Sequence, residues 1–348
     1  MPGYRLWRFV QDFEETPIAR VPRVRADLDA TDRWGTVATR LGAGRNDYRI
    51  APGLYCIGRP DDQSPVMVSA NYKLSFDVLR SHLKGIDAWI LVVDTNGINV
   101  WCAAGKGTFS TLEVAGRVNA TSLEKIVAHR RLILPQLSAT GVAARQVNTM
   151  CGFKVVWGPV HAKDIKVFLD NGMTSTPEMR KVTFSFTERM ELVPVELNHM
   201  GKPTLYVLPV LFLLSGIGTS LFSFSDAVSR GVIAFWAYIL ALLAGAVVTP
   251  ALLPWLPGAA FALKGIIPGA AAGVLLSIGF ANQLALLEMV ALSLFTVAVS
   301  SYLAMNFTGS TPFTSPTGVE KEMRRAIPVQ LVGMVAAAIL WASAGFVK

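Results

Sequence analysis

Residues 99–108 (NVWCAAGKGT) carry one cysteine, Cys102, at the start of a short predicted helix. Unpaired backbone N–H groups and the helix dipole favour negative charge at that end, so the thiol is biased toward thiolate. The next three residues, Ala103, Ala104 and Gly105, have little or no side chain and predict a flat surface that a broad planar ligand can approach. A soft thiolate beside such a surface favours ligation of a metal in a large flat cofactor over disulfide formation.

Two other chemistries fit this segment less well. The letters AAGKGT resemble part of a phosphate-binding loop, but that motif requires glycine and then Ser or Thr at two positions where the chain has Val100 and Gly107. A nucleophilic cysteine needs a histidine base, and all four histidines lie outside the segment, at positions 82, 129, 161 and 199. A cysteine hydrolase or acyltransferase is therefore the weaker alternative for Cys102, whereas Cys56 and Cys151 are expected to pack in the core.

Apolar runs that alternate with helical patterns predict an α/β domain around Cys102. We expect strands at 66–70, 88–94, 132–134, 154–157 and 181–186, and helices at 75–82, 112–117, 122–129, 142–149 and 162–170. Residues 110–113 (STLE) and 121–124 (TSLE) match the capping-box pattern and mark two of the helix starts. Strands that alternate with helices predict a mostly parallel, doubly wound, Rossmann-like sheet.

Ligands of such sheets bind beyond the carboxyl ends of the strands. The strand at 88–94 leads directly into residues 95–97 and the helix of Cys102, so the cysteine falls where the fold places a ligand. The loops at 136–141 and 158–160 follow neighbouring strands and are expected to line the same crevice. Outside residues 99–106, this prediction adds six candidate cofactor-binding residues: Thr108, Ser138, Thr140, Gly141, Gly158 and Pro159.

The 348-residue chain has two halves of different composition, although on average it is 52% hydrophobic and 16% charged. Residues 1–202 contain 26 of the 32 Lys and Arg, 20 of the 24 Asp and Glu, and all four His. The boundary near Lys202 and Pro203 therefore indicates a change of solvent from water to lipid. We expect an N-terminal arm or peripheral layer at 1–46, a ligand-binding α/β domain at 47–202 and a transmembrane domain at 203–348.

Five apolar segments approach the ~20 residues that a spanning helix needs. They are residues 206–224, 231–249, 265–281, 284–305 and 326–347. With the N-terminal domain in the cytoplasm, most basic residues within or next to this half fall on the cytoplasmic side, which agrees with the positive-inside rule: Lys202, Lys264, Lys321, Arg324 and Arg325. We therefore expect a multi-pass protein of the cytoplasmic (inner) membrane.

Two features of this half stay open at the level of sequence. Glu288 is either a functional intramembrane carboxylate or, as we favour, one that reaches the interface from a helix end, and no paired charges are expected within the spans. The loop at 306–325 is rich in Ser, Thr, Gly and Pro, which suits either a plain connector or an ordered lid.

The net charge of +8 has no dense Lys and Arg stripe with interleaved aromatic residues, so we expect no nucleic-acid partner. Contact with anionic membrane lipids explains the charge more simply. Three scattered cysteines are too few for a disulfide framework or a four-cysteine cluster, which predicts a reduced cytosolic domain without an iron–sulfur cluster in this chain. The first 25 residues are charged and contain several prolines, and they do not predict a signal peptide.

The sequence Asn-Val-Trp-Cys-Ala-Ala-Gly-Lys at 99–106 resembles the signature of the HgcA family of mercury-methylating corrinoid proteins. Residues 64–80, 158–169 and 307–328 are also similar to that family and to the corrinoid iron–sulfur proteins of acetyl-CoA synthesis. The resemblance covers roughly residues 50–348. It implies a corrinoid-binding domain at 47–202, followed by a membrane domain of about five helices.

The resemblance implies a cobalamin-type corrinoid with cobalt as the cofactor, and it makes Cys102 the catalytic residue and the lower axial cobalt ligand. The rest of the signature would form a cap helix against the lower corrin face: Asn99, Val100, Trp101, Ala103, Ala104, Gly105 and Lys106. A strongly donating thiolate suits release of the methyl group as a carbanion equivalent, which an Hg(II) acceptor requires. The usual alternative is histidine in an Asp-x-His-x-x-Gly motif, and its nearest match here, RSHLKG, has Arg80 in place of the aspartate.

The resemblance further implies methyl transfer from methylated cobalt to Hg(II), giving methylmercury. It implies a small HgcB-like ferredoxin as the electron donor, and by analogy a methyl donor of the folate type. Two alternatives remain. One is a membrane-anchored corrinoid methyl carrier that serves another acceptor in one-carbon metabolism, and the other is a cofactor-binding membrane sensor or transporter.

Overall fold

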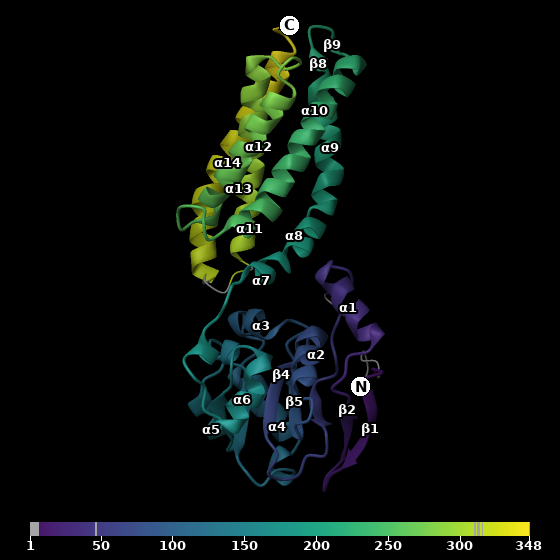
Figure 1. Cartoon of the computed structure of the whole chain (residues 1–348), viewed down its shortest axis with the longest axis vertical. Coiled ribbons are helices and arrows are strands. Elements are labelled where there is room, and N and C mark those ends of the chain that lie inside the picture. Colours follow the sequence, from purple (N-terminus) through teal and green to yellow (C-terminus); the bar gives the residue numbers. More distant parts are fainter. Residues whose placement is uncertain (1–6, 46, 310, 312–313, 315, 348) are drawn as a thin grey trace. The chain divides into compact units, whose positions relative to one another are not determined.

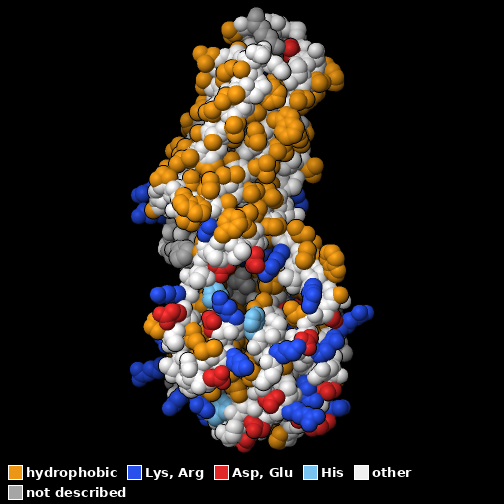
Figure 2. Space-filling view, in the orientation of Figure 1, with side chains coloured by type: hydrophobic (Ala, Val, Ile, Leu, Met, Phe, Trp, Pro, Cys, Tyr) orange, Lys and Arg blue, Asp and Glu red, His pale blue; other side chains and the backbone are white. Residues whose placement is uncertain are grey.

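The computed structural model describes residues 7–45, 47–309, 311, 314 and 316–347. The chain divides into two compact units: Met1–Thr39 with Ala43–Thr183, and Arg40–Gly42 with Phe184–Lys348. We call the first the α/β unit and the second the helical unit (Figure 1). Charged side chains are spread over the visible surface of the α/β unit (Figure 2). Apolar side chains cover most of the visible surface of the helical unit.

A seven-stranded mixed sheet forms the α/β unit, in the order β1-β2-β3-β5-β4-β6-β7. Its strands are β1 (Val10–Glu15), β2 (Arg20–Val24), β3 (Gly53–Ile57), β4 (Val66–Ala70), β5 (Ala88–Val93), β6 (Arg131–Leu134) and β7 (Lys154–Trp157). Strands β4 to β7 are mutually parallel and confirm four of the predicted strands. The pairs β1–β2 and β3–β5 are antiparallel, so the sheet is less uniformly parallel than predicted.

Six helices accompany the sheet: α1 (Ala30–Arg40), α2 (Lys73–His82), α3 (Val100–Lys106), α4 (Thr111–Ala120), α5 (Ala144–Cys151) and α6 (Ile165–Asp170). The helix predicted at 122–129 is wrong, because Ser122 has a left-handed backbone (φ 45°) and only the single turn Leu123–Lys125 follows. The strand predicted at 181–186 is also wrong, because this segment runs from a turn at Glu178–Arg180 into the next helix without pairing.

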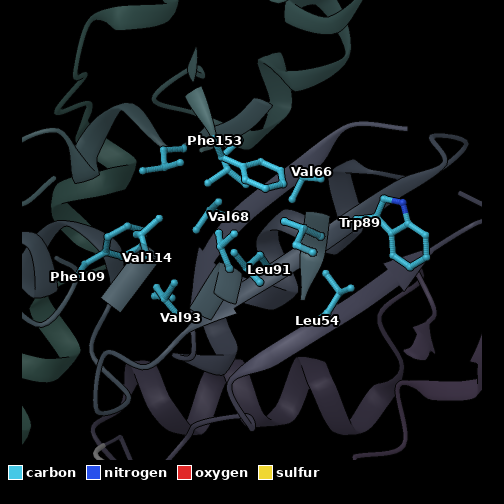
Figure 3. Packing of buried hydrophobic residues seen from close by; sticks show 14 of the residues in the cluster. Leu54, Val66, Val68, Trp89, Leu91, Val93, Phe109, Val114 and Phe153 are labelled. Atoms are coloured by element: carbon cyan, nitrogen blue, oxygen red, sulfur yellow. The ribbon is translucent and has the colours of Figure 1, made fainter. Parts of the chain in front are cut away.

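Alternate residues of the central strands face two separate hydrophobic cores, as the period of a strand requires. On one face Val66, Val68 and Leu91 pack beneath α4 and α5, and Figure 3 shows them converging with Val114 and Phe153. The residues between them belong to the opposite core, under α2 and α6: Met67, Ile90, Val92, Phe76 and Phe168 are examples. Both faces are therefore covered by helices, as in a doubly wound fold.

The strand order places a topological switch at β4. The chain leaves β4 for β5 on one side and then crosses back to β6 on the other side. In parallel sheets of this kind the crossovers leave the strands in opposite directions, and a crevice opens between their carboxyl ends. The fold thus predicts a ligand site at the ends of β4 and β6.

The helical unit begins with two short helices, α7 (Phe186–Met190) and α8 (Val193–His199). It continues with α9 (Gly201–Gly216), the hairpin of β8 (Ile217–Gly218) and β9 (Leu221–Phe222), α10 (Phe224–Leu243), a π-helical turn (Ala244–Val248) and α11 (Thr249–Leu252). The last three helices are α12 (Phe261–Gly279), α13 (Leu286–Thr308) and α14 (Pro316–Ala344). Among the described residues, four helices are long and apolar enough to cross a membrane: 224–252, 261–279, 286–308 and 317–344.

The expected span at 206–224 is wrong as a continuous helix. Helix α9 ends at Gly216, and a hairpin separates it from α10, so only a shorter apolar helix remains. A side chain at Gly218 would lie 2.9 Å from the carbonyl oxygen of Gly345, which leaves room for glycine alone. Helix α14 starts ten residues before the expected span at 326–347, so much of the predicted loop at 306–325 is helical. The remainder of that loop includes residues 310, 312–313 and 315, which lie outside the described residues.

Small residues let α12 and α13 approach closely. A Cβ atom added at Gly265, Gly269 or Gly273 would come within 2.9 Å of α13 atoms, including backbone atoms. Because apolar side chains gain little by leaving lipid for protein, membrane helices associate through such close backbone packing. Ser300 adds a hydrogen bond from its hydroxyl to the carbonyl oxygen of Gly265 at 2.7 Å.

Glu288 is buried within the helical unit, so the interpretation that it reaches the interface from a helix end is wrong. It is 3% exposed, and its carboxylate accepts a hydrogen bond from Nε of Arg230 at 2.8 Å. The guanidinium of Arg230 also donates to the backbone carbonyls of Ser215 and Trp341 and lies over the indole ring of Trp341. The helical unit therefore contains a buried ion pair, contrary to the prediction that its spans lack paired charges.

We predict that Gly269→Ala destabilises the helical unit by about 1–3 kcal/mol, because the new Cβ collides with backbone atoms of α13. Thermal unfolding of the detergent-solubilised chain measures the effect. Gly279→Ala on the same helix is the matched control, since a Cβ there meets no atom within 4 Å. Equal unfolding temperatures for the two variants would contradict the close-packing argument.

Candidate functional site

A cavity of about 350 Å³ lies at the carboxyl ends of β4, β6 and β7, where the strand order predicts a crevice. Its wall includes residues 67–69 of β4, 133–135 at the end of β6 and 158–160 after β7. Helix α2 contributes apolar side chains, and the start of α3 completes the wall with Asn99, Val100 and Trp101. The cavity thus joins the conspicuous segment at 99–106 to the loop at 158–160, as the sequence predicts.

Cys102 lies in the first turn of α3, immediately after the residues that line the cavity. The side-chain oxygen of Asn99 accepts a hydrogen bond from the backbone N–H of Cys102 at 2.8 Å and caps the helix. The thiol is free and Cys102 is partly exposed. Helix α3 ends at Gly107, whose left-handed backbone (φ 77°) closes it after seven residues. The cysteine is therefore held on a short, fixed element beside the cavity.

The loop between β5 and α3 is fixed by the buried side chain of Asn71. Its amide oxygen accepts hydrogen bonds from the N–H of Thr95 (3.0 Å), the hydroxyl of Thr95 (2.9 Å) and the N–H of Gly97 (2.9 Å). Its amide nitrogen donates to the carboxylate of Asp94 at 2.9 Å. The loop needs this support because two consecutive residues, Asn96 and Gly97, have left-handed backbones, with φ of 56° and 73°.

Ala103 and Ala104 face the protein core rather than an open surface. They are 0% and 4% exposed and pack in the core cluster of the sheet. Their small size does mark a close approach, but the approaching group is the loop after β6. A Cβ on Gly141 would lie 2.9 Å from the Cα of Ala104 and 2.3 Å from the carbonyl oxygen of Phe109. Gly105 and Lys106, by contrast, are exposed.

The other predicted binding residues divide into two groups. Gly158 and Pro159 line the cavity, and a Cβ at Gly158 would meet the side chain of Ile133 at 3.1 Å. Thr108, Ser138 and Thr140 do not line it. The hydroxyl of Ser138 donates to the carbonyl oxygen of Pro135, that of Thr108 donates to the carbonyl oxygen of Ala103, and Thr140 is exposed.

The lining of the cavity suits a mainly apolar ligand. Its wall is largely aliphatic, with Leu74, Val78 and Leu79 from α2, and α3 adds the indole of Trp101. Gln136 lies in sequence between two wall residues but does not itself line the cavity, and its buried Oε1 has no hydrogen-bond partner in the described part of the chain.

The other two cysteines differ from Cys102 in their environment. Burial raises the pKa of the Cys56 thiol to about 11, and that residue is completely buried on β3. Burial also raises the pKa of Cys151, whose thiol donates to the carbonyl oxygen of Val147 within α5. Both thiols therefore stay protonated at neutral pH, which agrees with core packing. Among the described residues, no group of three or more His, Cys, Asp or Glu is placed to hold a metal ion.

Histidine positions follow from the direction of the chain through the sheet. His82 ends α2 and His129 precedes β6, so both lie toward the amino ends of the strands, away from the cavity. His161 follows β7 and lies between the wall residues Val160 and Ala162. Its Nε2 is 3.1 Å from the hydroxyl of Thr183. Among the histidines of the α/β unit, His161 is thus the one beside the cavity.

Sequence reasoning missed Asn71 and the part of the wall formed by α2. The position of Asn71, directly after β4, was a usable signal because polar residues at that edge of a parallel sheet lie near the ligand crevice. Its partners are more than twenty residues away in sequence, at 94, 95 and 97, so spacing alone does not reveal them.

We predict that Asn71→Ala loosens the segment 94–106 without unfolding the sheet. The substitution leaves the N–H groups of Thr95 and Gly97 buried without their acceptor, at about 1–3 kcal/mol for each unsatisfied group. Hydrogen exchange measured by mass spectrometry should show faster exchange in this segment. Asn119→Ala, on the exposed side of α4, should leave the exchange unchanged. Unaltered protection in the Asn71 variant would rule out the proposed role of its amide.

Comparison with known proteins adds to this geometry. Residues 44–169 match the family model described as CO dehydrogenase/acetyl-CoA synthase delta subunit. The acetyl-CoA decarbonylase/synthase complex subunit gamma of Methanopyrus kandleri is 33% identical over 128 residues, which are 36% of this chain and 27% of that protein. The corrinoid/iron-sulfur protein large subunit of Moorella thermoacetica is 28% identical over 129 residues, which are 36% of this chain and 28% of that protein.

The chain therefore spans just over a quarter of the length of these relatives. The matched segment contains Asn71, Cys102 and every residue that lines the cavity. It ends before the helical unit begins at Phe184. The part of the α/β unit that carries the candidate site is thus similar to subunits of acetyl-CoA synthase complexes and to a corrinoid/iron–sulfur protein.

Proposed function

We propose that the chain is a membrane-bound, corrinoid-dependent methyltransferase that transfers a methyl group from cobalt to inorganic Hg(II), with Cys102 as the lower axial cobalt ligand. One observation carries the proposal. The residues Asn99, Val100 and Trp101, which precede the cysteine, line a cavity at the switch point of a sheet segment that is similar to a corrinoid protein. Mercury as the acceptor rests on the likeness of residues 99–106 to the signature of mercury-methylating proteins.

The chain's own residues can hold the cofactor in distinct ways. The aliphatic wall from α2 and the indole of Trp101 would pack against the macrocycle and exclude water from it. Gly158 gives the loop after β7 a close approach to β6. A bound corrinoid would supply the carbon–cobalt bond from which the substrate Hg(II) takes the methyl group.

The capped helix of Cys102 supports its proposed role as a ligand. The N–H of Cys102 is bound to Asn99, so the first turn is fixed before a ligand arrives. Its thiol must lose a proton to ligate, and its partly exposed position gives that proton a route to solvent. The nearest match to the histidine motif is unsuited to the role, because Arg80 is buried in ion pairs with Asp32 and Asp77 and His82 lies at the other edge of the sheet.

We propose that electrons come from a separate, small ferredoxin-type protein of the HgcB kind, since this chain's three cysteines are free and lie on three different elements. A methyl donor of the folate type and attachment to the cytoplasmic membrane, with the α/β unit in the cytoplasm, belong to the same proposal. The names of the relatives favour one alternative, in which the chain carries a methyl group to another acceptor of one-carbon metabolism.

We predict that Cys102→Ala lowers Hg(II) methylation by more than about 100-fold, beyond the loss typical of residues that merely support a metal ligand. The assay is anaerobic and combines the corrinoid-loaded chain with ferredoxin, methyl donor and Hg(II). The visible absorption of the bound corrinoid should shift in the same variant, because the axial ligand has changed.

Two variants serve as controls for this experiment. Cys151→Ala removes a thiol that is bonded within α5, and His161→Ala removes the histidine nearest the cavity. Neither should shift the spectrum. If His161→Ala shifts it and Cys102→Ala does not, the axial ligand is histidine and the thiolate assignment is wrong. Transfer to another acceptor with none to Hg(II) would support the methyl carrier instead.

A further inference from the structure

A second cavity, of about 470 Å³, lies wholly within the helical unit between α12, α13 and α14. Its lining changes in character along α14. Lys321 and Arg325 lie one helical turn apart, Val329 follows one turn later, and Gln330 adjoins it. Leu263 on α12 contributes an apolar side chain on the opposite wall. The cavity thus combines a cationic end with an apolar groove.

The two cations are available to an anion. Lys321 and Arg325 are both exposed, and neither has an ion-pair partner among the described residues. The neighbouring Arg324 differs, because it pairs with Glu320 at 2.7 Å and does not line the cavity. The lining also includes a carboxylate, Glu322, but its Oε1 accepts the backbone N–H of Ala262 at 2.7 Å. Glu322 therefore caps α12, and its charge faces that helix end.

Gln330 lines both this cavity and a neighbouring one between α9, α10, α13 and α14. It is 8% exposed, and its Nε2 donates to the hydroxyl of Ser301 at 2.9 Å. That hydroxyl in turn donates to the carbonyl oxygen of Ala262 at 2.9 Å, which fixes the direction of the chain of hydrogen bonds. Gln330 therefore joins α14 to α13 and α12 at the apolar end of the cavity.

The surroundings of the cavity indicate lipid. Of the four candidate membrane helices, that of α14 is the least buried within the protein: only 17% of its 18-residue apolar segment is buried. Leu263 and Val329 are 56% and 72% exposed, so apolar surface continues outward from the cavity. Basic residues at the end of a spanning helix lie at the depth of lipid headgroups and attract anionic lipids.

We propose that this cavity binds one anionic phospholipid through its phosphate group. Lys321 and Arg325 hold the phosphate, and the acyl chains lie over Leu263 and Val329. The inference rests on the helical unit alone and does not depend on the corrinoid proposal.

Native mass spectrometry of the full chain, released from detergent with defined lipids, tests the site. The wild-type chain should retain phosphatidylglycerol in preference to phosphatidylcholine. The double variant Lys321→Gln with Arg325→Gln should lose this preference by about an order of magnitude, since each charge near a membrane contributes roughly 1 kcal/mol. Arg324→Gln is the matched control on the same helix and should retain the wild-type preference.

Equal retention of the anionic and zwitterionic lipids by the wild-type chain would overturn the proposal. So would an effect of Arg324→Gln as large as that of the double variant. Displacement of the lipid by inorganic phosphate alone would show a site for free anions and would also overturn the proposal.

Discussion

The candidate site depends on the buried amide of Asn71. At the carboxyl edge of the sheet, β4 and β5 end side by side, and the chain must turn from β5 into α3 through two left-handed residues. The N–H groups of Thr95 and Gly97 point inward in that turn and find their acceptor in Asn71. Without that acceptor both N–H groups would be buried and unsatisfied. The cap of Asn99 on Cys102, and with it the position of the thiol, follows from that fixed turn.

A related constraint governs the helical unit, where lipid offers no substitute for a missing hydrogen bond. Arg230 is 5% exposed and has partners from four segments: Ser215, Ile217, Glu288 and Trp341. It binds the end of α9, the start of α13 and the last turns of α14 to α10. Glycines on α12 act over the rest of the bundle by letting backbones touch. Polar groups thus fix which helices meet, and small residues fix how closely they pack.

Local patterns predicted the elements whose signals are contained within a few residues. This class includes the parallel strands β4 to β7, the short helix of Cys102 and the contribution of residues 158–160 to the cavity. The pattern failed where the conformation of a single residue decides the outcome. The left-handed backbone of Ser122 prevents a helix at 122–129. Ser110 caps α4, but the side chain of Glu113 binds Asp94 and Arg117 and does not complete the capping box. An uncharged run was equally insufficient to define a span at 206–224, where a hairpin with a left-handed residue, Leu221 (φ 65°), separates α9 from α10.

Contacts between residues that are far apart in the sequence could not be predicted, because local patterns do not show which segments meet. Arg230 and Glu288 are 58 positions apart, so each reads as an isolated charge in a hydrophobic segment. Gly141 touches Ala104 only because two loops meet at the sheet edge, and the small residues at 103–105 were therefore interpreted as a surface for a ligand. Composition correctly indicates that such residues allow a close approach. It does not say what approaches, because that depends on the order of the strands.

The evidence for the two proposals comes from separate parts of the chain. All residues that support cofactor binding lie within 44–169, the segment shared with the relatives, whereas the lipid cavity is formed by residues 259–330. The similarity therefore supports a cofactor scaffold and carries no information about the membrane helices. Since no residue is common to both sites, loss of lipid selectivity in an α14 variant leaves the cobalt-ligand assignment intact. Likewise, an unchanged corrinoid spectrum in the Cys102→Ala variant would not affect the evidence for lipid binding in the cavity of Lys321 and Arg325.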